Sequence, residues 1–123
     1  MHSLRTAPVP ERLADAIAQL RDIVVELCAL VTKDPQVFTR HYALIDANLE
    51  LQGRDAVKSQ RQAELLADIL IGRGAEPSMA GLASQVALAC YQAARRSAEG
   101  DLRRLVDDTA LAFDRVLRLG EGA

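Results

Sequence analysis

Residues 34–96 decide the fold of this chain, and they read DPQVFTRHYALIDANLELQGRDAVKSQRQAELLADILIGRGAEPSMAGLASQVALACYQAARR. Asp34-Pro35 is typical of a helix start, because Asp caps free backbone N–H groups and Pro fits the first turn. Asn48 ends this helix or caps the next one, which Gly74 is placed to stop in a left-handed conformation. From about residue 77 to 97 the chain is apolar nearly all round, which is typical of a central helix. The stretch therefore predicts three helices and no strand.

Helices are also predicted on both sides of this stretch. Residues 10 to about 32 carry an apolar seam at helical spacing, made of Leu13, Ile17, Leu20, Val24, Leu27 and Val31. On the other side, Asp101 is predicted to cap a last helix. Short turns between about five helices favour antiparallel neighbours, so we expect an all-α antiparallel bundle over residues 10–119. We expect a flexible segment at 1–9 and a frayed tail at 120–123. Whether Gly53 bends the long third helix is left open.

The composition fits one soluble domain. The 123 residues suffice for a core without disulfides. Aromatic residues make up only 3%, so the core must consist of aliphatic residues and alanine, which favour helix. The net charge of -2, with both signs mixed along the chain, lacks the basic excess of a non-specific nucleic-acid binder.

Neither a membrane span nor a signal peptide is predicted. No apolar run approaches the roughly 18 residues that a span needs, and the first ten residues lack the apolar stretch of a secretion signal. Cys28 and Cys90 stand singly rather than as a CxxC pair, which favours buried thiols in a reducing compartment. We therefore expect a cytoplasmic protein.

The order of these elements resembles the C-terminal regulatory domain of TetR-family transcriptional regulators over nearly the whole chain. The matching segments are Leu4-Arg5-Thr6-Ala7-Pro8, Asp34-Pro35, Asn48-Leu49-Glu50-Leu51 with Arg54, Leu66 to Pro77, and Ala93-Ala94-Arg95-Arg96. Three positions depart from the family pattern. Leu49 stands where a proline is common, Ser97 where a tryptophan is frequent, and Glu76 where an aspartate cap is usual.

This resemblance implies a homodimer in which the last two helices pair with their symmetry mates. The helix over residues 77–97 supports a dimer independently, because it has one apolar side for the domain core and a second side for a partner. The candidate interface residues are Leu88, Tyr91, Leu102, Leu105, Val106, Phe113, Val116 and Leu117. The alternative is a monomer in which the first and last helices cover both sides.

The resemblance also implies a pocket for a small apolar or amphipathic ligand between the first four helices. The candidate ligand-binding residues are Phe38, His41, Tyr42, Ser59, Gln60 and Ala63. An apolar pocket with a few polar groups is the usual composition of such a site. Two alternatives remain: His41 is a satisfied core or rim residue, and the polar run 58–62 is simply exposed to solvent.

The sequence contains no catalytic or metal-binding arrangement. No nucleophile or orienting carboxylate is spaced to work with His41. The other histidine, His2, lies in the N-terminal segment, away from any second metal ligand. We expect no enzyme activity, no metal and no cofactor.

The functional expectation is therefore a ligand-sensing and homodimerisation domain of a TetR-type regulator. Family members read DNA through an N-terminal helix-turn-helix, and residues 1–123 offer no such recognition helix. DNA binding is thus expected from a domain outside this chain. The alternative is a stand-alone helical dimerisation or interaction module without a small-molecule site, and an enclosed apolar cavity near Phe38, Tyr42 and Gln60 would favour the sensor. The ligand, the operator and the origin of the chain (an excised domain, an incomplete gene product or a natural fragment) stay open.

Overall fold

The computed structural model describes residues 8–31, 49–99 and 101–121, which form four helices. They are α2 (Leu13–Val31), α4 (Leu49–Gly72), α5 (Pro77–Ala98) and α6 (Leu102–Glu121). These ranges contain no strand, so the all-α class is confirmed. The described bundle thus has four helices rather than about five, and the helix predicted to begin at Pro35 lies outside the described residues.

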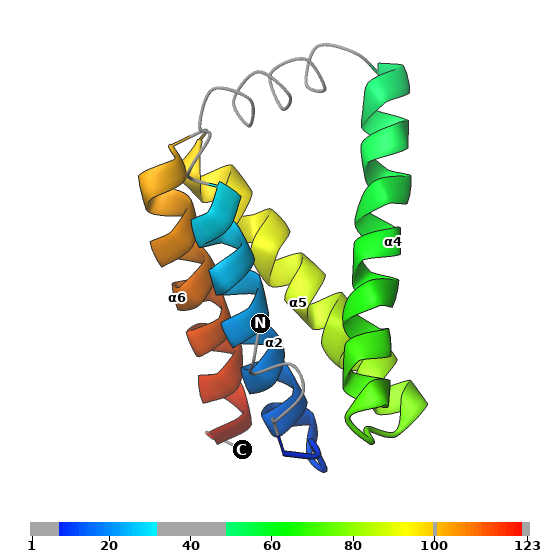
Figure 1. Ribbon diagram of the computed structural model, residues 1–123. Helices are drawn as coiled ribbons and strands as arrows, with labels where there is room; N and C mark the ends of the chain where they lie inside the picture. Colours follow the sequence, from blue (N-terminus) through cyan, green and yellow to red (C-terminus); the bar gives the residue numbers. More distant parts are fainter. Residues whose placement is uncertain (1–7, 32–48, 100, 122–123) are drawn as a thin grey trace.

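The central helix of the bundle is α5. It packs against α2, α4 and α6, whereas α4 packs mainly on α5. In Figure 1, α2 and α5 run in one direction and α4 and α6 run in the opposite one. Most of the buried side chains of α5 are small, which lets its neighbours approach closely: Ala80, Ala83, Ser84, Ala87, Cys90, Ala94 and Ala98. The central position predicted from the apolar character of this segment is confirmed.

The hydrophobic core lies mainly where α2, α5 and α6 meet. Leu20 of α2 and both Leu105 and Phe113 of α6 are fully buried there. The seam predicted on α2 is buried over its middle part, but Leu27 is exposed. Leu27 lies in the C-terminal half of α2, where α4 is further from α2 than at the other end. Part of the apolar surface of α2 therefore stays uncovered there.

Gly74 stops α4, as the sequence predicts. Its φ of +102° is a conformation that side chains other than glycine rarely adopt. The N–H of Gly74 donates to the Ile71 carbonyl at 2.9 Å, and the N–H of Ala75 donates to the Leu70 carbonyl at 3.0 Å. This pair of hydrogen bonds is the Schellman motif, which satisfies carbonyls left free at a helix end. The helix itself runs through Gly53 without a break.

Replacing Gly74 by alanine is expected to lower the free energy of unfolding by about 1 kcal/mol or more, because alanine is strained at this φ. The added Cβ would also lie 3.3 Å from two methyl carbons of Val9. Gly72 is the matched control: a Cβ there meets no atom within 4 Å. Gly72→Ala should raise stability by up to about 1 kcal/mol. Urea unfolding measures both variants, and a similar loss at both positions would contradict this explanation.

Glu76 caps the N-terminus of α5. Its carboxylate accepts hydrogen bonds from the hydroxyl of Ser78 at 2.6 Å and from the N–H groups of Ser78 and Met79 at 3.0 and 2.9 Å. The hydroxyl hydrogen bond, followed by the two backbone hydrogen bonds, holds the pKa of the Glu76 carboxyl below its usual value. Asp101 caps α6 similarly, by accepting from the N–H of Arg103 at 3.0 Å, so the predicted cap is confirmed.

The Glu76 cap is expected to make part of the stability depend on pH. Because folding lowers the pKa of this carboxyl, its contribution is present above the unfolded-state pKa and is lost as pH falls through the folded-state value. At neutral pH, Glu76→Gln should be less stable than the wild type. The difference should shrink as pH falls below the ordinary range of a glutamate carboxyl and the wild-type carboxyl becomes protonated.

Urea unfolding midpoints at several pH values measure this difference. The control is Glu76→Asp, which keeps a carboxylate of the type that caps helices well and should retain the pH dependence. A constant difference between the wild type and Glu76→Gln at every pH would contradict the assignment.

Polar contacts at the surface link α2 to α6 and to the end of α4. The guanidinium of Arg21 pairs with Asp114 of α6, with Nε and Oδ1 2.9 Å apart. At the end of α4, Arg73 donates to the amide oxygen of Gln19 at 2.6 Å, and the Gln19 amide nitrogen donates to the Pro8 carbonyl at 2.8 Å. The C-terminal end of α4 is therefore tied to the N-terminal half of α2.

Candidate functional site

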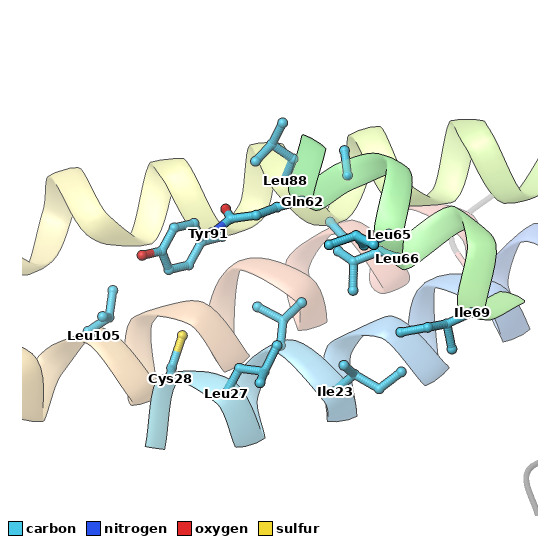
Figure 2. Close-up of a pocket in the computed structure, with 13 residues that line it drawn as sticks. Ile23, Leu27, Cys28, Gln62, Leu65, Leu66, Ile69, Leu88, Tyr91 and Leu105 are labelled. Carbon is cyan, nitrogen blue, oxygen red and sulfur yellow. The ribbon is translucent and has the colours of Figure 1, made fainter. Parts of the chain in front are cut away.

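An apolar pocket of about 360 Å³ lies between α2, α4 and α5 (Figure 2). The lining residues are Ile23, Val24, Leu27 and Cys28 of α2, Gln62, Ala63, Leu65, Leu66 and Ile69 of α4, Ala87, Leu88 and Tyr91 of α5, and Leu105 of α6. Its volume falls within the range of small-molecule sites, roughly 300–1,000 Å³. The side chains of Leu27 and Leu65 are exposed and mark the open side of the pocket.

Two alanines help to keep this space open. Ala63 of α4 and Ala87 of α5 both line the pocket, and both are fully buried. The methyl groups of these two alanines fill little volume. The other residues that α4 contributes to the lining, such as Leu66 and Ile69, have larger side chains. Protein interiors are normally close-packed. A void of this size between small residues is therefore a specific feature of how the three helices meet.

The few polar groups of the pocket gather towards one end. In Figure 2, Cys28 and Tyr91 lie at one end and Ile23 and Ile69 at the other, and the Gln62 side chain extends towards the Tyr91 ring. Tyr91 is half-buried and Gln62 is exposed. The pocket thus has an aliphatic end and an end where polar atoms are within reach of an occupant.

Cys28 is held as a neutral thiol in the pocket wall. Its Sγ lies 3.8 Å from the hydroxyl oxygen of Thr109, which is itself fully buried. Burial raises the pKa of the Cys28 thiol, and the contact with Thr109 offsets this only in part. A thiol in such surroundings is a weak nucleophile. Cys28 therefore contributes apolar surface to the site.

Of the predicted ligand-binding residues that the structure describes, Ala63 is the one that lines the pocket. Phe38, His41 and Tyr42 lie outside the described residues. Ser59 is buried but is not among the residues that line the pocket. Gln60 is exposed, and its amide oxygen accepts a hydrogen bond from Gln85 at 3.1 Å, so Gln60 joins α4 to α5 beside the pocket.

The residues predicted for a dimer interface face the interior where the structure describes them. One group lines the pocket: Leu88, Tyr91 and Leu105. The others belong to the core side of α6, where Phe113 is fully buried and three half-buried residues pack against the core: Val106, Val116 and Leu117. The side chain of Leu102 lies outside what the structure describes. An apolar stripe shows that a helix face is covered, but not whether the same chain or a second copy covers it.

Most of the pocket-lining residues were not singled out from the sequence. Val24 and Leu27 were placed in the apolar seam of the first helix, and Ala63 among the candidate ligand-binding residues. The available signal was the width of the apolar faces of these helices, since each is broader than one neighbouring helix can cover. That width indicates a second contact surface, but it does not distinguish a further helix from a ligand.

The groups that line the pocket are suited to binding an apolar molecule. None of the described lining residues is ionisable near neutral pH, and no group of His, Cys, Asp and Glu in the described ranges could hold a metal ion. None of the described helices is long and apolar enough to cross a membrane. The arrangement can enclose an apolar molecule and donate or accept hydrogen bonds at one end.

Comparison with known proteins gives no match. No protein-family model fits the chain, and no curated protein or solved structure is detectably similar to it. Function is therefore inferred from the pocket and from the chemistry of its lining.

Proposed function

We propose that this chain is the ligand-sensing and homodimerisation domain of a TetR-type transcriptional regulator, with DNA binding supplied by a domain outside residues 1–123. The observation that supports ligand sensing is the apolar pocket of about 360 Å³ between α2, α4 and α5. The regulator type rests on the sequence segments that resemble the TetR-family regulatory domain. A largely apolar lining with a few polar groups is the usual composition of a small-molecule site.

The position of the pocket suits a sensor. It is bounded by two helices that are tied together at one end, where Arg73 of α4 contacts Gln19 of α2. A ligand in the pocket contacts both helices, starting about one helical turn from this contact at Ile23 and Ile69. The ligand will stabilise the spacing between α2 and α4 that it fits best. A ligand shifts a conformational equilibrium only when it binds one conformation more tightly than the other.

A contact surface for the homodimer must be exposed on the single chain, and Leu88, Leu105 and Phe113 are buried in it. Among the described residues of α5 and α6, the large apolar side chains that remain exposed are Leu82, Leu111 and Leu119. We propose these as the contact residues. Sedimentation equilibrium at micromolar concentration tests the dimer, and a monomer of about 13 kDa, the mass of this chain, would remove it.

Ligand sensing is tested by thermal unfolding against a panel of uncharged apolar molecules. A ligand selective for the native state adds about 2.7 kcal/mol at a hundredfold excess over its Kd. For a domain of this size, that corresponds to a rise in Tm of roughly 10 °C. If no molecule of the panel changes the Tm, sensing at this pocket is wrong.

The two cysteines show whether such a molecule occupies the pocket. Cys28 lines it and Cys90 does not, yet both thiols are almost fully buried, with exposed fractions of 3% and 5%. Burial raises the pKa of both thiols, so both should react slowly with N-ethylmaleimide. A ligand in the pocket should slow alkylation of Cys28 more than that of Cys90, as measured by peptide mass spectrometry. Equal slowing would indicate general stabilisation without occupancy.

The open side of the pocket favours a second candidate, a helical interaction module without a small-molecule ligand. Leu27, Leu30 and Leu65 present exposed apolar surface there or next to it. In that case no small molecule protects Cys28. Leu65→Glu should then abolish association with a protein partner, while Ile71→Glu, at an exposed apolar residue of the same helix outside the pocket, should not.

A further inference from the structure

We infer that the pocket selects an uncharged, elongated molecule whose single hydrogen-bonding group is received by Gln62. This inference rests on the proposed ligand-sensing function and specifies the class of ligand. Three features of the described residues carry it: the absence of charge in the lining, the division of the pocket into two ends, and the position of the Gln62 amide.

The described lining residues provide no charge to pair with an ionised ligand. The ionisable side chains of α4 near the pocket, including Lys58, Arg61, Glu64 and Asp68, are exposed and do not line it. An ionised group moved from water into apolar surroundings without a partner loses far more solvation free energy than a neutral polar group does. The lining therefore discriminates against carboxylates and ammonium groups.

The two ends of the pocket differ in chemistry. Ile23, Leu66 and Ile69 make one end entirely aliphatic, and Tyr91 and Gln62 bring polar atoms towards the other (Figure 2). A molecule that extends from one end to the other meets hydrocarbon along most of its length. Its polar group then lies at the Gln62 end.

Gln62 is the side chain that recognises this group. Its amide carries two N–H donors and a carbonyl acceptor, so it can pair with a hydroxyl, a ketone or an amide. The Cys28 thiol is less suitable, because it already contacts the Thr109 hydroxyl. The Gln62 side chain is exposed at the edge of the pocket. It can therefore bond to an occupant without first breaking hydrogen bonds to buried protein groups.

Three probes of matched length test the inference: 1-decanol, decanoate and decylammonium at pH 7.5. The readout is protection of Cys28 relative to Cys90 as a function of probe concentration. We expect 1-decanol to bind about a hundredfold more tightly than either ion. Similar affinities for all three probes would overturn the inference and leave ligand sensing intact.

A pair of variants tests the role of Gln62. Gln62→Leu should weaken 1-decanol binding about fivefold, the effect of one neutral hydrogen bond, and should leave the binding of n-decane unchanged. The control is Gln92→Leu, at a half-buried glutamine of α5 that does not line the pocket, and it should change neither affinity. Equal weakening of both probes by Gln62→Leu would overturn the role of the amide.

If a molecule of the apolar panel binds but 1-decanol does not, the inference fails alone. If nothing binds, the proposed function fails with it.

Discussion

Replacing Phe113 by alanine is expected to lower the free energy of unfolding by about 3–5 kcal/mol. Phe113 is the largest of the fully buried side chains, and it belongs to the core in which α6 packs on α2 and α5. Its truncation removes apolar contacts and leaves a cavity that the surrounding helices can fill only in part. Because a domain of this size is stable by roughly 5–15 kcal/mol, the variant should lose a large fraction of its stability. Phe113→Leu removes fewer atoms and should remain folded with a smaller loss.

The same experiment decides whether Phe113 acts in the core or at a dimer interface. Leu111 lies two residues earlier on α6 and is exposed, so Leu111→Ala should change the stability of the monomer by no more than about 0.5 kcal/mol. Urea unfolding at two protein concentrations separates the two roles. The loss at a core residue does not depend on concentration, whereas the loss at an interface residue does. A loss at Phe113 that changes on dilution would contradict its placement in the core.

Replacing Ala83 by leucine is expected to lower the free energy of unfolding by about 2–3 kcal/mol, whereas Ala87→Leu should leave it unchanged or raise it. Both alanines are fully buried on α5 and lie one helical turn apart. Only Ala87 borders the pocket. A leucine at Ala83 must displace packed neighbours, while a leucine at Ala87 enters empty space, and filling a cavity commonly adds about 0.5–2 kcal/mol.

Ala87→Leu also separates folding from binding. If the pocket holds a ligand, this variant should fold at least as stably as the wild type and lose the rise in Tm that the ligand produces. Thermal unfolding with and without the best molecule of the panel measures both effects. Equal destabilisation by the two leucine substitutions would indicate that the space beside Ala87 is closed in solution.

The ends of the described helices could largely be predicted from the sequence. Gly74, Glu76 and Asp101 mark these ends, and each acts through hydrogen bonds to residues within about five positions along the chain. One detail differs. The positive φ after α5 falls on Glu99, at 51°, a residue for which no such role was predicted. Asn, Asp and Gly are the usual residues for that conformation, so a glutamate gave no signal.

The faces of the helices were predicted less well than their ends. Leu88 and Phe113 were both placed at a dimer interface, yet the first lines the pocket and the second is buried in the core. Periodicity gives the direction of an apolar face, but it does not identify the surface that meets this face. Ser59 and Gln60 were predicted as candidate ligand-binding residues, but the polar residue of α4 that lines the pocket is Gln62, two positions after Gln60.

By itself, the sequence determined that the chain is helical, where α4, α5 and α6 end, and that the helix from Pro77 to Ala98 is central. These properties depend on caps, turns and apolar spacing, which act over a few residues. Only the tertiary structure decided that a pocket exists, that Ala63 and Ala87 line it, and that Leu105 and Phe113 of α6 are buried within this chain. A void is the space that side chains from different helices leave unfilled. It depends on how these helices cross, which no local pattern records.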